Sequence, residues 1–336
     1  MSVSKVKGFQ ISPGWLAGFT QSDGCFTMTF EKTQTGLYLR PRPIYMLAQE
    51  YSEVDMFKSI FEYLGVGYTH KSKNNVVLEV KSLSGLRDVI FPIFDNHQLK
   101  FGKLKAYLIF KKIVNEMLNK NHLKLEGLLR IVYMSQLLNA DTARRTDDSF
   151  NNLLKYLESK HGKLPTPDEL NINSWMASIT ETLKLPTSAL TLDFIAGLID
   201  GDGSFNVGFQ FKPYRRVKVN FTVIQESSCK ELLNELVSYF SCGKVYDLPS
   251  ASSRFQIEKV DLMLNNIFPI LDKAIFNTRK GEKYEIAKKV CEIIKTEGYK
   301  SDEALREIVD LSYNSNNSGR SRKITKEEFL NKLQVN

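Results

Sequence analysis

The sequence predicts an α+β fold in which one αββαββα(α) domain occurs twice, with the copies related by a pseudo-twofold axis and each copy holding one antiparallel β-sheet. Three observations support this prediction. A short run of small and apolar residues that includes Asp-Gly occurs at 14–26 and again at 193–205. Strand-like and helix-like segments then follow both runs in the same order. The chain has 336 residues, which is enough for two domains of ordinary size.

The second run reads as a short helix that leads into a strand. Thr191 can cap the helix, because its hydroxyl can accept a hydrogen bond from a first-turn N–H. Gly197 and Gly201 are four residues apart and share one helical face, which allows another helix to approach closely. Gly203 is expected to take the left-handed conformation that ends a helix. Asp202 lies near the negative end of the helix dipole, so we expect a cation to offset its charge.

The first run matches the second at an offset of 179 residues, which aligns Asp23 with Asp202. Ser12 then takes the capping position, and Pro13 the first helical position, where its missing N–H costs little. The small face of this helix consists of Gly14, Gly18 and Ser22. If the two helices pack through these faces, their terminal carboxylates meet. Two carboxylates about 4 Å apart repel by roughly 4 kcal/mol at an effective dielectric near 20, and divalent cations between them would create a binding site.

Two strand-like segments follow each helix, at 25–30 and 40–50 in the first half and at 204–211 and 215–225 in the second. Polar and apolar residues alternate strictly along 218–223, so one face of the strand enters a core and the other faces solvent or a partner. The partner-facing candidates are Lys32, Arg40, Arg42, Gln210, Lys212, Tyr214, Arg215, Arg216, Lys218 and Asn220. Any one of them could equally belong to a solvated outer face.

The composition of the chain indicates what kind of molecule it can bind and which kinds of site it lacks. The net charge is +8, from 46 basic and 38 acidic residues, and it favours an anionic partner. No apolar run is long enough for a membrane span, and no apolar secretory segment is visible near the start. The four cysteines include no C-x-x-C pair, which argues against disulfides or a zinc site. The histidines have no ligand spacing; they are His70, His97, His122 and His161.

The repeat continues through the rest of each half. Helices are expected at 54–64 and 230–240, each followed by a second strand pair, and long amphipathic helices at 104–119 and 284–296. A whole domain has therefore been duplicated. We divide the chain into an N-terminal half-domain, a linker with helical segments and a C-terminal half-domain, at 1–140, 141–190 and 191–336.

The two runs resemble the two motifs of a single-chain LAGLIDADG homing endonuclease, at 16–24 and 195–203. The second is close to the family consensus. The first departs from it at Thr20 and Gln21, where the family usually has an apolar residue and an acid. The resemblance implies that the motif helices lie at the domain interface and that the two sheets form a DNA-binding saddle.

The resemblance also implies a divalent-metal site. The metal-binding acids would be Asp23 and Asp202, with the backbone carbonyls of Ser22 and Gly201 as additional ligands. The metal would be Mg²⁺ or Mn²⁺, whereas Ca²⁺ would bind without supporting cleavage. Asp200 has no acidic counterpart and is expected to be structural or to order water.

Further family positions find matches in both halves. Gln49 and Gln225 end strands and would position the attacking water, while Lys103 and Lys280 would neutralise charge at the cleaved phosphate. Other basic residues close to those lysines leave their assignment open; these are Lys100, Lys105, Arg279 and Lys283.

The function implied is that of a monomeric, metal-dependent endonuclease that cuts both strands of an asymmetric double-stranded DNA target near 20 bp. Two alternatives stay open: an RNA-binding maturase that helps the host intron to fold, and a DNA-binding protein without catalysis. Family habit places the protein in an organelle, the mitochondrion ahead of the chloroplast.

Overall fold

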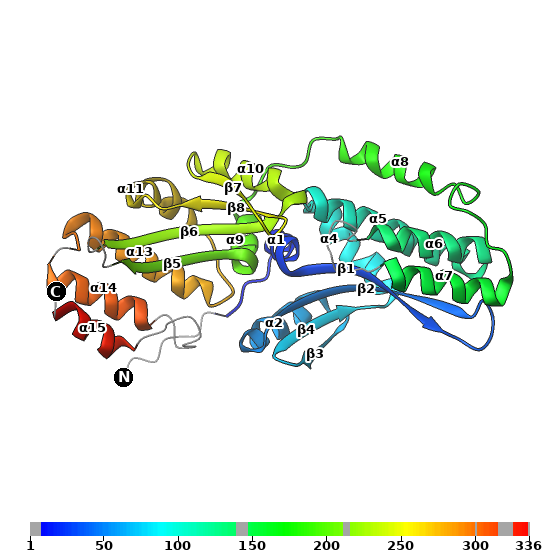
Figure 1. The fold of residues 1–336 in the computed structure, drawn as a ribbon, viewed down its shortest axis with the longest axis horizontal. Helices are drawn as coiled ribbons and strands as arrows, with labels where there is room; N and C mark the ends of the chain where they lie inside the picture. The colour runs from blue at the N-terminus through cyan, green and yellow to red at the C-terminus, as the bar shows by residue number, and fades with distance from the viewer. Residues whose placement is uncertain (1–7, 139–146, 211–215, 300, 315–324, 335–336) are drawn as a thin grey trace. The chain divides into compact units, whose positions relative to one another are not determined.

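The computed structural model describes residues 8–138, 147–210, 216–299, 301–314 and 325–334 (Figure 1). The chain divides into two compact units, Met1–Phe194 and Ile195–Asn336. The expected packing of the two motif helices concerns how the units sit together, and it stays a prediction. No helix within the described residues is long and apolar enough to cross a membrane.

The first unit contains a four-stranded antiparallel sheet in the order β1-β2-β4-β3. Its strands are β1 (Gly24–Lys32), β2 (Leu39–Glu50), β3 (Tyr68–Ser72) and β4 (Asn75–Val80). Its helices are α1 (Pro13–Asp23), α2 (Val54–Leu64), α3 (Leu83–Gly85), α4 (Phe91–Asn96), α5 (Phe101–Leu118), α6 (Leu125–Leu137), α7 (Asp147–His161) and α8 (Ile172–Leu183). A π-helical turn joins α3 to α4 and leads into Pro92, whose ring an unbroken α-helix would exclude.

The second unit repeats this order with the sheet β5-β6-β8-β7. Its strands are β5 (Gly203–Gln210), β6 (Arg216–Glu226), β7 (Lys244–Leu248) and β8 (Ser252–Ile257). Its helices are α10 (Lys230–Phe240), α11 (Val260–Leu262), α12 (Phe268–Leu271), α13 (Lys280–Thr296), α14 (Asp302–Asn314) and α15 (Lys326–Gln334). The second motif helix, α9 (Leu192–Asp202), starts in the first unit and continues into the second. The α+β duplication read from the sequence is confirmed.

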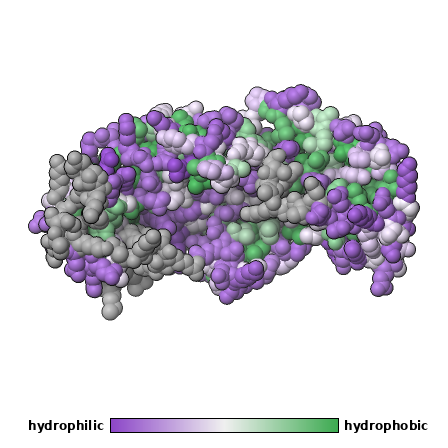
Figure 2. Space-filling model, in the orientation of Figure 1, coloured by the Kyte–Doolittle hydropathy of each residue, from purple (hydrophilic) through white to green (hydrophobic). Residues whose placement is uncertain are grey.

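Each sheet buries one face beneath its helices. Phe26 of β1 is fully buried and contacts the rings of Tyr45, Phe94 and Tyr107. In the second unit Phe205 of β5 stacks on Phe221 with ring centroids 4.5 Å apart. Hydrophilic residues cover most of the surface that faces the viewer in Figure 2. Over most of β2 and along β8, buried residues alternate with more exposed ones, so the face of each sheet away from its helices carries the more exposed side chains.

The motif helices end differently from the expectation for Gly203. Neither Gly24 nor Gly203 has a positive φ, and each starts a strand. A Cβ at Gly24 would lie 2.6 Å from the carbonyl oxygen of Thr20, and one at Gly203 would lie 2.8 Å from Cα of Ile199. Glycine is needed because the strand turns back closely over the last helical turn, not because of a left-handed backbone.

The predicted linker contains a further repeated element. Tyr133 of α6 packs against Phe150 of α7 with ring centroids 5.7 Å apart, and Tyr313 of α14 packs against Phe329 of α15 at the same distance. Thus α7 is the counterpart of α15. Farther along, α8 lies over α5 and α6, where Lys112 donates to Oγ of Ser178 at 2.9 Å (Figure 1).

Candidate functional site

In the first unit, the last residue of α1 is held by a hydrogen bond from a side chain of β2. Ser12 caps α1 as expected, accepting from the N–H of Trp15 at 3.1 Å. Eleven residues of helix then end at Asp23, and β1 starts at Gly24. Nε2 of Gln49, next to the end of β2, donates to Oδ2 of Asp23 at 2.8 Å. The structure therefore brings together the predicted acid and the predicted glutamine of the first half.

The second unit repeats this pair. Thr191 caps α9 as expected, accepting from the N–H of Phe194 at 3.2 Å. Nε2 of Gln225, next to the end of β6, donates to Oδ2 of Asp202 at 2.5 Å. Gln225 is buried, and Asp202 is half-buried. Each half thus presents one carboxylate whose orientation is fixed by an amide from the neighbouring strand.

A lysine reaches each motif from the helix that follows the sheet. Nζ of Lys103 donates to the carbonyl of Gly24 at 2.6 Å, and Nζ of Lys280 donates to the carbonyl of Gly201. Lys100, an alternative at this position, is buried and turns instead to the hydroxyl of Thr187 at 3.1 Å. The geometry of the first half thus favours Lys103 over Lys100.

The residues that precede these acids are structural. The fully buried Asp200 accepts from the backbone N–H groups of Asn277 and Thr278, at 2.7 and 3.2 Å. In the first half Oε1 of Gln21 accepts from the N–H of Lys100 at 2.9 Å. An amide oxygen performs the task of a carboxylate oxygen here, which explains why Gln21 can replace the acid that the motif usually has.

The polar face of the second sheet gathers the predicted partner-facing residues. The β5–β6 register places Gln210 opposite Arg216, and Lys218 and Asn220 follow on the same face, because side chains alternate along a strand. Arg216 and Lys218 are exposed, and Asn220 is half-buried. Three further predicted residues lie outside the described residues; these are Lys212, Tyr214 and Arg215.

Three polar atoms on this same face lack hydrogen-bond partners among the residues that the structure describes. They are Oδ1 of Asn220, Nε of Arg254 and Oε1 of Gln256, each shielded from solvent. Arg254 and Gln256 lie on β8, where the register sets them opposite Ile224 and Thr222 of β6. An unpaired buried polar atom costs about 1–3 kcal/mol, so a ligand that supplied the missing partners would stabilise this face.

The first sheet divides its predicted residues between its two faces. Arg40 and Arg42 are exposed on the polar face, where Nη2 of Arg42 donates to Glu31 at 2.8 Å. This hydrogen bond, together with the charge of Arg42, lowers the pKa of Glu31. Lys32 pairs with the buried Leu39 and therefore lies on the helix-covered face, where its Nζ sits 4.4 Å from the ring centroid of Tyr156. Lys32 is not brought together with the two arginines.

Two segments of the chain, 16–114 and 195–291, match the family model described as "LAGLIDADG endonuclease". They include most of both motif helices and the whole of both sheets. The chain belongs to the LAGLIDADG endonuclease family. A relative from Mycosarcoma maydis, "Probable intron-encoded DNA endonuclease 1", is 36% identical over 280 residues, which is 83% of this chain and 98% of the relative.

The chain is also similar to a further curated relative and to solved structures. "Homing endonuclease I-ApeII" from Aeropyrum pernix is 25% identical over 147 residues, covering 41% of this chain and 86% of its own. The crystal structure of I-SmaMI bound to cleaved DNA superposes with a TM-score of 0.78 at 21% identity, over 93% of this chain and 99% of that one. The crystal structure of I-CpaMI bound to uncleaved DNA superposes with a TM-score of 0.75 at 24% identity, over 93% of this chain and 100% of that one.

The donor set of the LAGLIDADG helix ends fits a hard divalent cation. Each half offers one carboxylate, Asp23 or Asp202, beside backbone carbonyls at a helix end. Within the described parts of the chain, no group of three or more His, Cys, Asp or Glu side chains could hold a metal by itself. A cation such as Mg²⁺ keeps several waters and takes phosphate oxygens as ligands, so it needs only a few protein oxygens.

Sequence reasoning missed Arg254 and Gln256 of the LAGLIDADG domain. Both lie on β8, a strand from which no partner-facing residue was predicted. The pattern was nevertheless present, because Ser252, Arg254 and Gln256 alternate with the buried Ser253, Phe255 and Ile257. Reading this strand with period 2 would have assigned both residues to the polar face.

Proposed function

We propose that this LAGLIDADG protein is a site-specific DNA endonuclease that hydrolyses one phosphodiester bond in each strand of an asymmetric target near 20 bp. One observation carries the proposal: a carboxylate at a helix end, an amide donor beside it and a lysine at the adjoining backbone occur together in both halves. An acid with no function would not be expected to recur with the same two kinds of partner, an amide and a lysine. Two such centres would allow one bond to be hydrolysed in each strand of a duplex.

The residues of each centre have separate tasks. Gln49 and Gln225 hold Oδ2 of their acids and can orient the water that attacks phosphorus. The ammonium groups of Lys103 and Lys280 stabilise the negative charge that develops on the phosphate. Their present acceptors are backbone carbonyls, which phosphate oxygens can replace as charged acceptors.

A divalent metal would be held by Asp23 and Asp202, with the carbonyls of Ser22 and Gly201 in support. Bound Mg²⁺ or Mn²⁺ would lower the pKa of the attacking water and stabilise the departing oxygen. Ca²⁺ would occupy the site without supporting cleavage; a structure of I-SmaMI with an uncleaved DNA target was obtained in the presence of calcium ions. Because Lys280 donates to the carbonyl of Gly201, metal binding there would require this lysine to share or leave that oxygen.

The polar sheet faces would read the target. Arginine recognises guanine, and asparagine or glutamine recognises adenine, through paired hydrogen bonds in the major groove. The second sheet offers Asn220, Arg254 and Gln256 with unsatisfied atoms, whereas the first offers Arg40 and Arg42. Because the two faces carry different side chains, the target would be asymmetric.

We place the protein in an organelle, the mitochondrion first. The support is that relatives from Mycosarcoma maydis and Neurospora crassa carry names that describe them as intron-encoded. Monomeric action follows from two centres in one chain. Binding to the host intron RNA stays a prediction.

The test is to incubate the purified full chain with a randomised plasmid library and Mg²⁺, and to sequence the broken ends. Breaks that share one asymmetric sequence of about two helical turns are expected. The Asp23→Asn/Asp202→Asn double variant serves as the matched control, and it should bind the recovered sequence without cutting it. The absence of sequence-dependent breaks with either Mg²⁺ or Mn²⁺ would overturn the proposal.

A further inference from the structure

The helix that carries each proposed catalytic lysine also carries a second lysine and a tyrosine on the same face. The spacing is four residues in both helices, which places the three side chains one above another. In α5 the set is Lys103, Tyr107 and Lys111, and in α13 it is Lys280, Tyr284 and Lys288. The first member of each set donates to the backbone of the motif, whereas the other two contact an aspartate.

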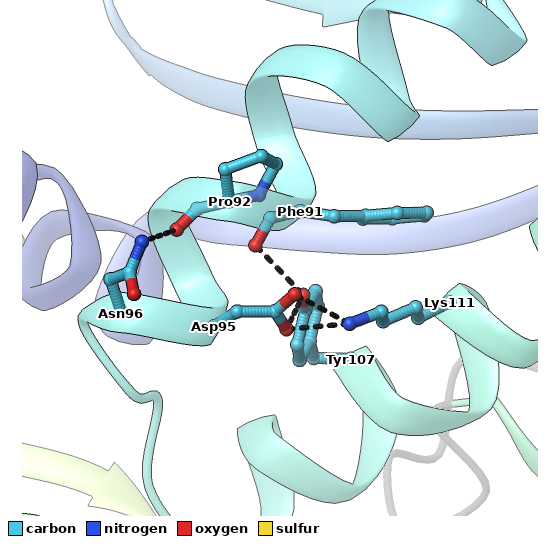
Figure 3. A network of polar contacts seen from close by, with 6 residues as sticks. All are labelled: Phe91, Pro92, Asp95, Asn96, Tyr107 and Lys111. Carbon is cyan, nitrogen blue, oxygen red and sulfur yellow. Dashed lines mark hydrogen bonds and ion pairs between the residues drawn. The ribbon is translucent and has the colours of Figure 1, made fainter.

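In the first unit this aspartate is Asp95, at the end of α4 (Figure 3). Oη of Tyr107 lies 2.7 Å from Oδ1 of Asp95, and Nζ of Lys111 lies 2.7 and 2.5 Å from its two carboxylate oxygens. The same Oη is also 3.2 Å from the carbonyl of Phe91. These contacts tie the second and third turns of α5 to both ends of α4.

The second unit repeats the cluster around Asp272. Oη of Tyr284 lies 2.5 Å from its Oδ1, and Nζ of Lys288 lies 2.6 and 2.8 Å from its two oxygens. The carbonyl of Phe268 takes the place of that of Phe91, 3.3 Å from Oη. Surface ion pairs are rarely reproduced in such detail, so this duplication points to a shared task.

Neither helix has a capping side chain at its N-cap residue, which is Lys100 in α5 and Arg279 in α13. In α13 the hydroxyl of Thr278 accepts from the N–H of Lys280 at 3.2 Å. Phe101, the first residue of α5, has a φ of +45°, which is strained for a residue with a side chain. Because Lys103 and Lys280 lie in these first turns, contacts made farther along each helix also help to set their position.

The tyrosines make the link to the motif. Tyr107 and Tyr284 are almost fully buried, and their rings contact Phe26 and Phe205 at centroid distances of 5.5 and 5.4 Å. Each phenylalanine is two residues beyond the glycine that starts its strand. Burial, and then the neighbouring carboxylate, raises the pKa of both tyrosines, so each keeps the proton that it donates.

We propose that Asp95 and Asp272 are positioning residues, each of which locks a tyrosine and a lysine and thereby aims the first-turn lysine of its own half at one strand of DNA. This inference rests on the proposed function. Since each half has its own cluster, damage to one cluster should affect one strand only.

The test uses a supercoiled plasmid and an end-labelled duplex that carry the recovered target. Asp95→Asn keeps the shape of the side chain but removes its charge, and a small misplacement of a catalytic group can cost about 10- to 100-fold in rate. We expect nicked plasmid to accumulate, with one strand cut slowly and the other at the wild-type rate. Asp272→Asn should slow the opposite strand. Asp55→Asn, which breaks the exposed ion pair with Lys58, is the matched control and should change neither strand.

A double-mutant comparison separates positioning from general damage. In a Lys103→Met background, Asp95→Asn should slow the affected strand no further, because it acts through that lysine. Additive losses, equal slowing of both strands or wild-type cutting by a folded Asp95→Asn protein would each overturn the inference. Such results would leave the proposed function intact, whereas a wild-type protein that cuts no target would contradict the function itself.

Discussion

The hydroxyl of Thr20 lies 2.8 Å from the phenol oxygen of Tyr45, and both side chains are fully buried. Thr20 is the position at which the first LAGLIDADG motif departs from an apolar residue. The aligned positions of the second half are Ile199 and Phe221, which carry no side-chain polar group. The two halves therefore differ at two positions that contact each other. In the first half the hydroxyl of Thr20 in the motif helix is the hydrogen-bond partner of the hydroxyl of Tyr45 on β2.

Thr20→Val should destabilise the protein, because it leaves the phenol of Tyr45 buried without its partner. We expect a loss of about 1–3 kcal/mol in the free energy of unfolding, measured by urea titration. Adding Tyr45→Phe should restore most of this loss, since it removes the unsatisfied group and recreates the apolar pair of the second half. Equal destabilisation by the single and the double variant would show that the hydrogen bond is not the reason.

Buried tyrosines also predict sensitivity to alkali. Burial raises the pKa of Tyr45, Tyr107 and Tyr284 above the value of about 10 that tyrosine has when unfolded. The stability that they contribute is complete below pH 10 and is lost as pH rises further. Each should lower the free energy of unfolding by up to about 1.4 kcal/mol per pH unit above 10. Urea midpoints between about pH 8 and 11 measure this, and Tyr45→Phe should make the decline shallower.

Much of the fold could be predicted because the signals were local and occurred twice. The ranges expected for α2 and α10 match the structure, because both helices have a clear amphipathic period and end before a Gly or Cys-Gly turn. The starts of α5 and α13 were placed three and four residues too late, since neither has a capping side chain to mark its beginning. The repeated α7 escaped notice because its likeness to α15 rests mainly on one phenylalanine.

In the candidate site, too, the features with a local sequence signal could be predicted and the others could not. The pairs Asp23–Gln49 and Asp202–Gln225 followed from the motif resemblance. The face of Lys32 did not, because one residue of register decides it and the hairpin turn hides that register. Partners remote in sequence, such as the contact of Lys100 with Thr187, leave no local pattern.

Phe150 and Phe329 should contribute similarly to the two units. Each joins its own helix, α7 or α15, to a tyrosine of the preceding helix, and Phe329 also packs on Phe209 of β5, with ring centroids 4.9 Å apart. Phe329→Ala should cost about 3 kcal/mol and expose the end of β5. Hydrogen exchange would detect this as faster exchange confined to α15 and β5, while Phe150→Ala should affect α7 instead. Unchanged exchange in both variants would contradict the repeat assignment.

Asp202→Asn should slow cutting by about 100-fold or more, because it removes the charge of a proposed metal ligand while keeping a side chain that Gln225 can contact. Binding to the recovered target, measured in Ca²⁺ by fluorescence anisotropy, should stay close to wild type. EDTA should abolish cutting by the unmodified protein, and added Mn²⁺ should restore it. Persistent cutting by the variant would remove Asp202 from the metal site.

Arg254→Met should make the free protein more stable and less selective. The change removes the shielded Nε that has no partner, which should raise the free energy of unfolding by about 1 kcal/mol, and it keeps the apolar stem. The same guanidinium would read a base, so its loss should cost about 1–3 kcal/mol of discrimination at one position of the target. Sequencing of the sites cut from a library would show that position relaxed.

Lys244→Met, an exposed neighbour in the register of the same face, is the control and should weaken salt-dependent binding without a gain in stability. A loss of stability on replacing Arg254 would mean that its guanidinium serves the fold and not a ligand.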